Sequence, residues 1–186
     1  MLNNQLKSDL HKQQLLPILN TTNLESDIAR LKKYLNQNKS IEYIEITLRE
    51  KESFSIALEL KKYFSDCKFG LGSVLTKEDL IRGQDHNFNF YVSPGIIEEI
   101  LEMKNPFYIP GAETVSEFIH LSKKGYEIIK FFPANLNGEY KKLQSIKNIL
   151  RNIKFIPTGG VNKDNIDKYL NLKNVLCVGT SNFEEF

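Results

Sequence analysis

The stretch Glu127-Ile128-Ile129-Lys130-Phe131-Phe132-Pro133 is the part of the sequence from which the fold can be worked out. It is a short apolar run closed by a proline, a pattern typical of a buried strand that ends there. Side chains alternate across a strand, so Ile128, Lys130 and Phe132 share one face. We therefore predict a strand that holds a lysine between two apolar side chains.

Two interpretations of Lys130 are compatible with this stretch alone. Desolvation disfavours an ammonium ion, so a lysine at a dry position can supply a neutral amine nucleophile near pH 7. A lysine on a strand can also serve only to prevent pairing with another strand edge. The choice between them depends on the rest of the chain.

The composition suits one globular domain, residues 1–186, a length near that of the smaller β/α barrels. Hydrophobic residues make up 41% of the chain and charged residues 26%, which is enough for a core and a polar surface. The net charge of +2 comes from interspersed charges without a basic block. We therefore expect neither nucleic acid nor a membrane as a partner.

Cysteine and histidine usage argues against a disulfide scaffold and a metal centre. Cys67 and Cys177 lie in apolar stretches and are expected to be reduced thiols. His11, His86 and His120 are scattered and are interpreted as surface residues rather than metal ligands. We therefore expect no metal, and we expect no cofactor. There is no apolar run of 18 residues and no signal peptide, so we expect a cytoplasmic protein.

Strand and helix patterns alternate along the chain, after an N-terminal helix predicted within residues 1–13. The eight predicted strands are residues 15–19, 41–48, 68–71, 88–92, 107–109, 127–133, 154–156 and 175–178. Predicted helices follow every strand but the last, among them 23–37, 96–104, 113–124, 138–150 and 162–171. Asn23 and Thr76 are predicted to begin two of the helices.

This alternation predicts an α/β fold with a parallel sheet, because parallel neighbours need crossover connections. Eight units favour a closed (β/α)8 TIM barrel over an open doubly wound sheet. Pro17 is expected to interrupt the first strand. Residues 182–186 are too few for a helix, so the barrel is expected to lack its last C-terminal helix. The groove left bare should be covered by this tail, by the N-terminal helix or by a neighbouring subunit.

The predicted second strand carries polar residues on one face. Glu45, Thr47 and Arg49 share that face, and the outer face of a barrel strand must be apolar to pack against helices. The polar face therefore points inward, where a buried charge must be paired or used in chemistry. A purely structural ion pair between Glu45 and Arg49 remains the alternative.

Two glycine turns, Thr158-Gly159-Gly160 and Gly179-Thr180-Ser181, follow the last two predicted strands. In TIM barrels, phosphate usually binds at these two loops. Glycine lets backbone N–H groups approach a phosphate, and a helix predicted to open at Asn162 would add its positive dipole end. We predict a phosphate site here, with purely structural glycine turns as the alternative.

Seven segments, in register between about residues 15 and 181, resemble successive blocks of one enzyme family. The segments are Glu45-Ile46-Thr47-Leu48-Arg49, Gly70-Leu71-Gly72-Ser73-Val74-Leu75, Ser93-Pro94-Gly95, Ile109-Pro110-Gly111, Thr114-Val115-Ser116-Glu117, Lys130-Phe131-Phe132-Pro133-Ala134 and Pro157-Thr158-Gly159-Gly160. The family is that of the 2-keto-3-deoxy-6-phosphogluconate aldolases, which also includes 4-hydroxy-2-oxoglutarate aldolases. The resemblance implies a metal-free class I aldolase on a trimeric (β/α)8 barrel, with a small keto acid as substrate.

The resemblance also implies site residues. Lys130 is expected to form the Schiff base, and Glu45 to act as the general acid and base. The expected substrate-binding side chains are those of Arg49, Ser73, Thr47, Pro94 and Phe132. The expected phosphate-binding residues are Thr158, Gly159, Gly160, Gly179 and Ser181. Three features depart from the family pattern: serine at position 73 in place of threonine, glutamate at 113 in place of serine, and an end at Phe186, roughly one helix early.

The expected reaction is cleavage of 2-keto-3-deoxy-6-phosphogluconate to pyruvate and glyceraldehyde 3-phosphate. One alternative is cleavage of 4-hydroxy-2-oxoglutarate to pyruvate and glyoxylate by the same residues. A second alternative is a catalytically weak barrel that only binds phosphate. A scaffold protein fits less well, because it has no use for three ionisable groups inside a barrel.

Overall fold

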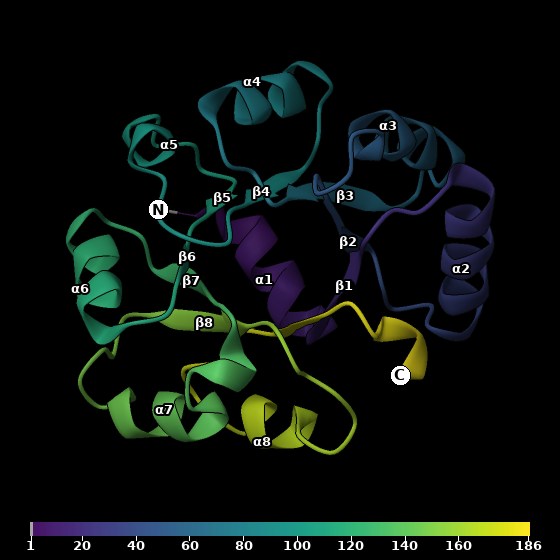
Figure 1. Ribbon diagram of the computed structural model, residues 1–186. Helices are drawn as coiled ribbons and strands as arrows, with labels where there is room; N and C mark the ends of the chain where they lie inside the picture. Colours follow the sequence, from purple (N-terminus) through teal and green to yellow (C-terminus); the bar gives the residue numbers. More distant parts are fainter. Residues whose placement is uncertain (1) are drawn as a thin grey trace.

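The computed structural model describes residues 2–186 and shows a mixed α/β fold around a curled parallel sheet (Figure 1). Strands pair in the order β5-β4-β3-β2-β1-β9, and a second group pairs in the order β6-β7-β8. The strands are β1 (Leu15–Leu19), β2 (Tyr43–Thr47), β3 (Lys68–Gly72), β4 (Phe90–Val92), β5 (Tyr108–Ile109), β6 (Gly111–Ala112), β7 (Ile128–Phe131), β8 (Lys154–Pro157) and β9 (Val178–Thr180). Two isolated parallel bridges, Phe155–Val175 and Thr158–Gly179, link β8 to the β9 region.

Helices α2 to α8 lie outside the strands, whereas α1 lies across the middle of the curled sheet (Figure 1). The α-helices are α1 (Asn4–Gln13), α2 (Leu24–Gln37), α3 (Ser53–Tyr63), α4 (Lys77–Asp85), α5 (Glu98–Glu102), α6 (Val115–Lys123), α7 (Glu139–Ile146) and α8 (Ile166–Leu170). The 3₁₀ helices are η1 (Ala134–Leu136) and η2 (Phe183–Glu185). Two predicted helix starts are confirmed, because the Asn23 and Thr76 side chains cap α2 and α4.

The predicted faces of the strands are confirmed by two separate apolar clusters. Ile44 and Ile129 belong to the large cluster that β2 and β7 share with the surrounding helices. Tyr43 and Ile128, one residue away on the same strands, belong to a second cluster inside the curled sheet. The inward face of each strand therefore runs from an apolar residue at its amino end to Glu45 on β2 and Lys130 on β7.

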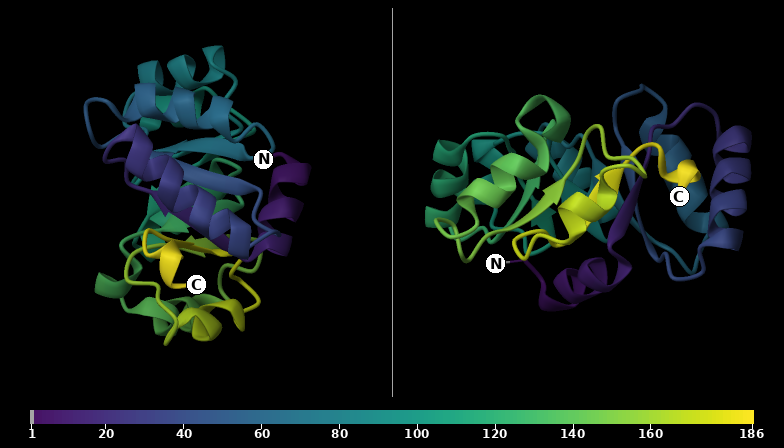
Figure 2. Two further views of the ribbon diagram at one scale, coloured as in Figure 1. Left: turned by 90° about the vertical axis from the view of Figure 1, so that its right-hand side faces the viewer. Right: turned by 90° about the horizontal axis from the view of Figure 1, so that it is seen from below.

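The inner cluster is completed by α1. Leu2, Leu6 and Leu10 are buried in it, and α1 lies at one end of the strands in the second view of Figure 2. A predicted stripe of leucines four residues apart thus faces the amino ends of the strands. This apolar contact fills that end of the fold and leaves the carboxyl ends as the place for a site.

Three predicted elements differ in the structure. Pro17 does not interrupt β1, in which it lies opposite Thr180 of β9, because its missing N–H is not needed there. The fifth predicted strand ends at Ile109, as predicted, but the chain resumes after Pro110 as the short strand β6, which pairs with β7. The helix predicted from Asn162 begins only at Ile166.

The C-terminal tail covers the groove beside β1 and β9. Phe183 is fully buried, and its ring centroid lies 4.9 Å from that of Tyr34 on α2. The Arg30 Nη2 atom of α2 lies 3.0 Å from Glu184 Oε2, which ties the same tail to this helix. Of the three predicted covers, the structure uses the tail, whereas the N-terminal helix fills the end of the strands. Within residues 2–186, no helix is both long and apolar enough for a membrane span.

Candidate active site

Lys130 and Glu45 face each other inside the curled sheet. The Lys130 Nζ atom lies 2.9 Å from Glu45 Oε1, and the two residues are only 5% and 1% exposed. A Cβ atom on Gly72 of β3 would overlap the Glu45 carboxylate, so this glycine makes room for the glutamate. An amine and a carboxylate in contact at a dry position can exchange a proton, which is what nucleophilic catalysis by lysine requires.

This pairing decides two alternatives that the sequence leaves open. Lys130 does not protect a strand edge, because β7 pairs with both β6 and β8 and the lysine is buried. Glu45 pairs with Lys130 and not with Arg49. The Arg49 Nε atom instead donates to Ser73 Oγ at 3.3 Å, at the more exposed rim of the same strands.

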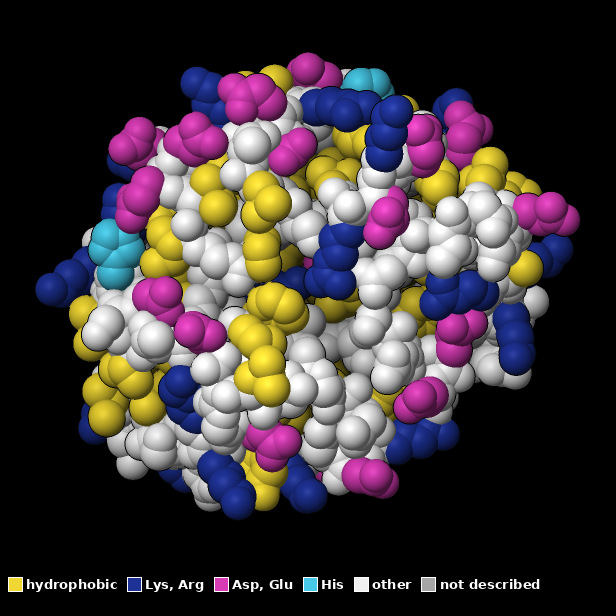
Figure 3. All heavy atoms as spheres, in the orientation of Figure 1, with side chains coloured by type: hydrophobic (Ala, Val, Ile, Leu, Met, Phe, Trp, Pro, Cys, Tyr) yellow, Lys and Arg dark blue, Asp and Glu magenta, His cyan; other side chains and the backbone are white. Residues whose placement is uncertain are grey.

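A cavity of about 150 Å³ lies at the carboxyl ends of the strands. Of the predicted site residues, it brings together Arg49, Lys130, Phe132, Thr158, Gly159, Gly160 and Ser181. The face in Figure 3 looks onto the centre of the fold, where hydrophobic and basic side chains meet. The predicted nucleophile Lys130 and most of the residues predicted for phosphate binding thus share one cavity.

Five predicted residues are absent from the lining of this cavity, among them Glu45, which contacts Lys130 from β2. Thr47 is buried, and its hydroxyl donates to Asn20 Oδ1 at 2.9 Å. Gly179 lies under Thr158, where an added Cβ would come within 2.5 Å of Oγ1. Ser73 lies beside the cavity with a left-handed φ of 56°, and Pro94 is half-buried nearby. These residues support the cavity from behind or from its rim.

Asn20 is a lining residue that the sequence analysis missed. It directly follows the apolar residues of β1, at the carboxyl end of that strand. Its position could have identified it from the sequence, since polar residues directly after barrel strands tend to be functional. The contact with Thr47, 27 residues away, could not be predicted from the sequence pattern.

The first glycine turn packs against η1. Gly159 and Gly160 have φ values of 99° and 70°, which favour glycine. Thr158 O accepts from Ala134 N at 2.8 Å, and Gly159 O accepts from Asn135 N at 3.2 Å. Two carbonyl groups of the turn therefore point toward η1. The bridge between Thr158 and Gly179 occupies the N–H of Gly159, whereas within residues 2–186 the N–H groups of Gly160 and Ser181 have no hydrogen-bond partner.

The predicted contribution of a helix dipole at this turn is wrong. Helix α8 is short and begins at Ile166, beyond the turn. The Asn162 N–H is already bound by Asn165 Oδ1 at 2.9 Å, since asparagine side chains compete for backbone groups in turns. An anion bound at Gly159 and Gly160 would therefore be held by a backbone N–H group of the turn itself and not by a helix dipole.

The remaining chemistry-bearing side chains play no visible part in this cavity. Burial raises the pKa of the Cys177 thiol, and the nearby Glu45 carboxylate raises it further, so the thiol stays protonated. The three histidines are exposed, as predicted. Within residues 2–186, no group of three or more His, Cys, Asp or Glu side chains could hold a metal ion.

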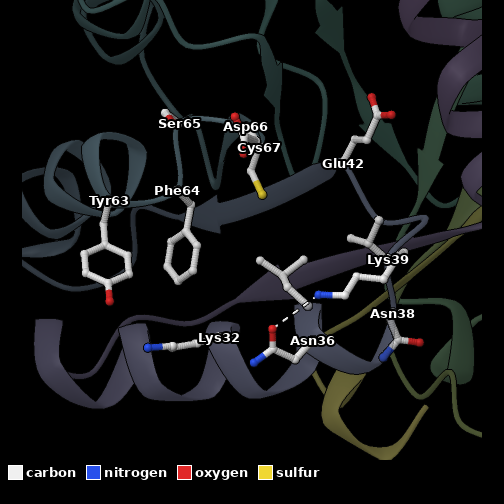
Figure 4. Close-up of a pocket in the computed structure, with 12 residues that line it drawn as sticks. Lys32, Asn36, Asn38, Lys39, Glu42, Tyr63, Phe64, Ser65, Asp66 and Cys67 are labelled. Carbon is white, nitrogen blue, oxygen red and sulfur yellow. Dashed lines mark hydrogen bonds between the residues drawn. The ribbon is translucent and has the colours of Figure 1, made fainter.

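A larger hollow of about 620 Å³ lies elsewhere, between the carboxyl ends of α2 and α3 (Figure 4). Lys32, Tyr63 and Cys67 are among its lining residues, and none of the predicted site residues is. Its size alone does not make it the site, because it lacks convergent groups with a shared chemistry. The smaller cavity with the buried lysine is the candidate active site.

Comparison with known proteins identifies the family of this chain. The curated KHG/KDPG aldolase of Escherichia coli strain K12 is 35% identical over 144 residues, covering 76% of this chain and 68% of that protein. The 2-dehydro-3-deoxy-phosphogluconate aldolase of Dickeya dadantii strain 3937 is also 35% identical, with the same coverage.

A solved structure of KDPG aldolase from Legionella pneumophila has pyruvate captured at low pH as a covalent carbinolamine intermediate. It is 32% identical to this chain and superposes with a TM-score of 0.85, covering 94% of this chain and 85% of that one. The family model described as KDPG and KHG aldolase matches residues 6–186. The chain therefore belongs to the KDPG and KHG aldolase family.

Proposed function

We propose that this chain is a class I aldolase that cleaves 2-keto-3-deoxy-6-phosphogluconate to pyruvate and glyceraldehyde 3-phosphate. The observation that carries the proposal is the buried contact of 2.9 Å between Lys130 Nζ and Glu45 Oε1, beside a cavity at the carboxyl ends of the strands. The names of the curated relatives and the carbinolamine in the Legionella structure support the same chemistry, because a carbinolamine forms when an amine adds to a ketone.

Lys130 acts as the nucleophile in the proposed mechanism. Its neutral amine adds to the C2 ketone and forms a carbinolamine, and loss of water then gives an imine. Glu45 is close enough to take a proton from the ammonium group and to return one to the departing hydroxyl. The protonated imine is the electron sink for the next step.

Glu45 acts as the base in the cleavage itself. It removes the proton of the C4 hydroxyl, directly or through a water molecule. The electrons of the C3–C4 bond move into the imine, which leaves an enamine on Lys130 and releases glyceraldehyde 3-phosphate. Protonation at C3 and hydrolysis of the imine then free pyruvate and the lysine.

The pyruvate half is held near the rim of the cavity. Arg49 can bind the carboxylate with two parallel N–H groups, and its contact with Ser73 keeps the guanidinium beside the cavity. Ser73 supplies a hydroxyl to the same carboxylate. Phe132, whose ring centroid lies 5.6 Å from Lys130 Nζ, and Pro94 limit the space around the ketone.

The phosphate is held at the two glycine turns. The N–H groups of Gly160 and Ser181 are free to donate to phosphate oxygens, and Gly159, with its left-handed φ, shapes the first turn around the phosphate. Gly179 and Thr158 support these turns from below, where the absence of a side chain at Gly179 lets the two strands approach closely.

The finer features of the fold belong to the same proposal. Residues 1–186 form one domain, and the strands close into a (β/α)8 barrel through the bridges between β8 and β9. In this barrel, η2 stands where the last C-terminal helix would pack.

The oligomeric state and the cellular role also belong to the proposal. The enzyme is a homotrimer that acts in the cytoplasm, in carbohydrate metabolism. Light scattering tests the trimer, and a stable monomer would contradict it.

Cleavage of 4-hydroxy-2-oxoglutarate to pyruvate and glyoxylate is the second candidate reaction. The observation that favours it is the similarity to the Escherichia coli protein, whose name includes both activities. The two substrates share the keto acid end, so the same lysine and glutamate would serve both.

A retro-aldol assay with both keto acids tests the proposal. We expect pyruvate release from each, with the higher kcat/KM for the phosphorylated substrate because only it reaches the glycine turns. Incubation with pyruvate and borohydride should add a reduced pyruvyl group to Lys130 and abolish activity. If pyruvate is released from neither substrate, the chain only binds ligands and the proposal is wrong.

A further inference from the structure

Within residues 2–186, the Asn20 side chain has an oxygen that accepts a hydrogen bond and an NH2 group that donates none. The Thr47 hydroxyl donates to Asn20 Oδ1 at 2.9 Å, closer than its other acceptor, the Leu19 carbonyl, at 3.5 Å. Thr47 is only 1% exposed, so the hydroxyl that orients the amide is held firmly in the fold. The Asn20 Nδ2 group therefore points away from Thr47, and it donates to no group within residues 2–186.

The position of Asn20 relates this free donor to the substrate. In the order of the strands, β1 lies between β2, which carries Glu45, and β9, which leads into Ser181. Asn20 lines the same cavity as Lys130 and Gly160. A substrate with its keto acid end at Lys130 and its distal anion at the glycine turns can therefore place its middle beside Asn20.

We propose that the Asn20 amide binds the aldehyde half of the substrate, by donating to an oxygen beyond the C3–C4 bond that is cleaved. This inference rests on the proposed aldolase function. The acceptor is a hydroxyl oxygen in the phosphorylated sugar acid and a carboxylate oxygen in 4-hydroxy-2-oxoglutarate. A half-buried amide donor without a protein partner gains most from a ligand that supplies one.

Two variants separate this role from a structural one. Asn20→Asp keeps an oxygen that accepts from Thr47, and it replaces only the free donor with a negative oxygen. We expect kcat/KM for both keto acids to fall more than about tenfold, because the carboxylate repels the substrate anion. Asn20→Ala removes the donor without adding charge, and we expect a fall of about three- to tenfold.

The decisive measurement uses pyruvate alone, which lacks the aldehyde half. Borohydride trapping of pyruvate on Lys130 should show the same concentration dependence in both variants as in the wild type. Asn148→Ala is the matched control, because Asn148 is exposed and lies outside the cavity, and it should cleave both substrates at the wild-type rate.

Three outcomes would overturn the inference. Wild-type kcat/KM in Asn20→Asp would show that the donor is not used. An equal loss of pyruvate trapping would place Asn20 on the pyruvate half or show that the site has collapsed. A loss in Asn20→Ala but not in Asn20→Asp would reveal a purely packing role. Failure of the proposed function itself is distinct, because wild-type protein would then neither trap pyruvate nor cleave a keto acid.

Discussion

The two ends of the same strands have opposite chemistry on their inward faces. At the amino ends, Tyr43 of β2 and Ile128 of β7 pack against the leucines of α1 and exclude water. Two residues further along, Glu45 and Lys130 form a buried ion pair. At the carboxyl ends, the cavity opens beside Arg49 and the glycine turns.

This difference explains how the fold keeps a charged pair stable and reactive. The apolar end supplies the free energy of folding, because each large buried aliphatic side chain contributes about 1.5–3 kcal/mol. The carboxyl end contributes less, since an ion pair that is removed from water gains little or nothing overall. Variants at the two ends should therefore change different properties, activity at one end and stability at the other.

Lys130→Arg should have the largest effect. A guanidinium stays protonated and cannot form the imine, so retro-aldol activity should fall on the order of 10⁴-fold or more. Mass spectrometry after treatment with pyruvate and borohydride should find an adduct on Lys130 in the wild type and none in the variant. An adduct that maps to Lys141 or another lysine would sink the assignment.

Glu45→Gln should separate the base from the nucleophile. The variant should still form the pyruvate imine, at least slowly, but cleave its substrate about 10²–10⁴-fold more slowly, the usual effect of a positioned acid and base. Steady-state kinetics measure the cleavage and borohydride trapping measures the imine. Turnover at the wild-type rate would contradict the role of Glu45.

Leu10→Ala tests the opposite end of the strands. Leu10 is fully buried in the inner cluster, so its truncation should lower the free energy of unfolding by about 2–5 kcal/mol. Once folded, the variant should keep kcat within a factor of about two, an expectation for a site that the change does not touch. Urea unfolding and steady-state kinetics measure the two quantities.

Leu136→Ala serves as the matched control, because Leu136 of η1 is 77% exposed. Its free energy of unfolding should change by less than about 0.5 kcal/mol. If Leu10→Ala lowered kcat by much more than about twofold while leaving the free energy of unfolding unchanged, the assignment of stability to one end and activity to the other would be incorrect.

Deletion of residues 182–186 should weaken phosphate binding. The deletion removes Phe183 from its contact with Tyr34, and Ser181 then loses the order that this tail supplies. We expect the affinity for the phosphorylated substrate to fall about tenfold, comparable to the loss of one or two hydrogen bonds. Titration with both keto acids should show a smaller change for the unphosphorylated one, and equal losses would speak against a role in phosphate binding.

The Cys177→Ala substitution should have the smallest effect, and it tests whether the interior around this thiol excludes water. Its pKa is raised by burial and by Glu45, so the folded state keeps a proton that the unfolded chain loses above about pH 9. The thiol therefore contributes stability below that pH, and the contribution is lost as pH rises further. Urea unfolding between pH 7 and 10 should show a shallower decline in Cys177→Ala than in the wild type, and identical slopes would refute this.

Much of the architecture follows from local patterns. Alternation along each strand was enough to place Lys130 and Glu45 on inward faces, because a strand reverses its side chains at every residue. The leucine spacing of α1 and the caps at Asn23 and Thr76 are also local signals. The start of α8 could not be predicted, because the Asn165 side chain competes with the helix for the Asn162 N–H.

The strand faces, the order of the elements and the family resemblance could be read from the sequence, since they depend on residues close together along the chain. The pairing of Glu45 with Lys130, 85 residues away, and not with Arg49, only four residues along the chain, depended on the tertiary structure. The tertiary structure also decided that Asn20 turns its oxygen to Thr47 and its free amide to the cavity. The physical reason is that such partners meet only when distant strands curl together, and no local propensity encodes the distance between them.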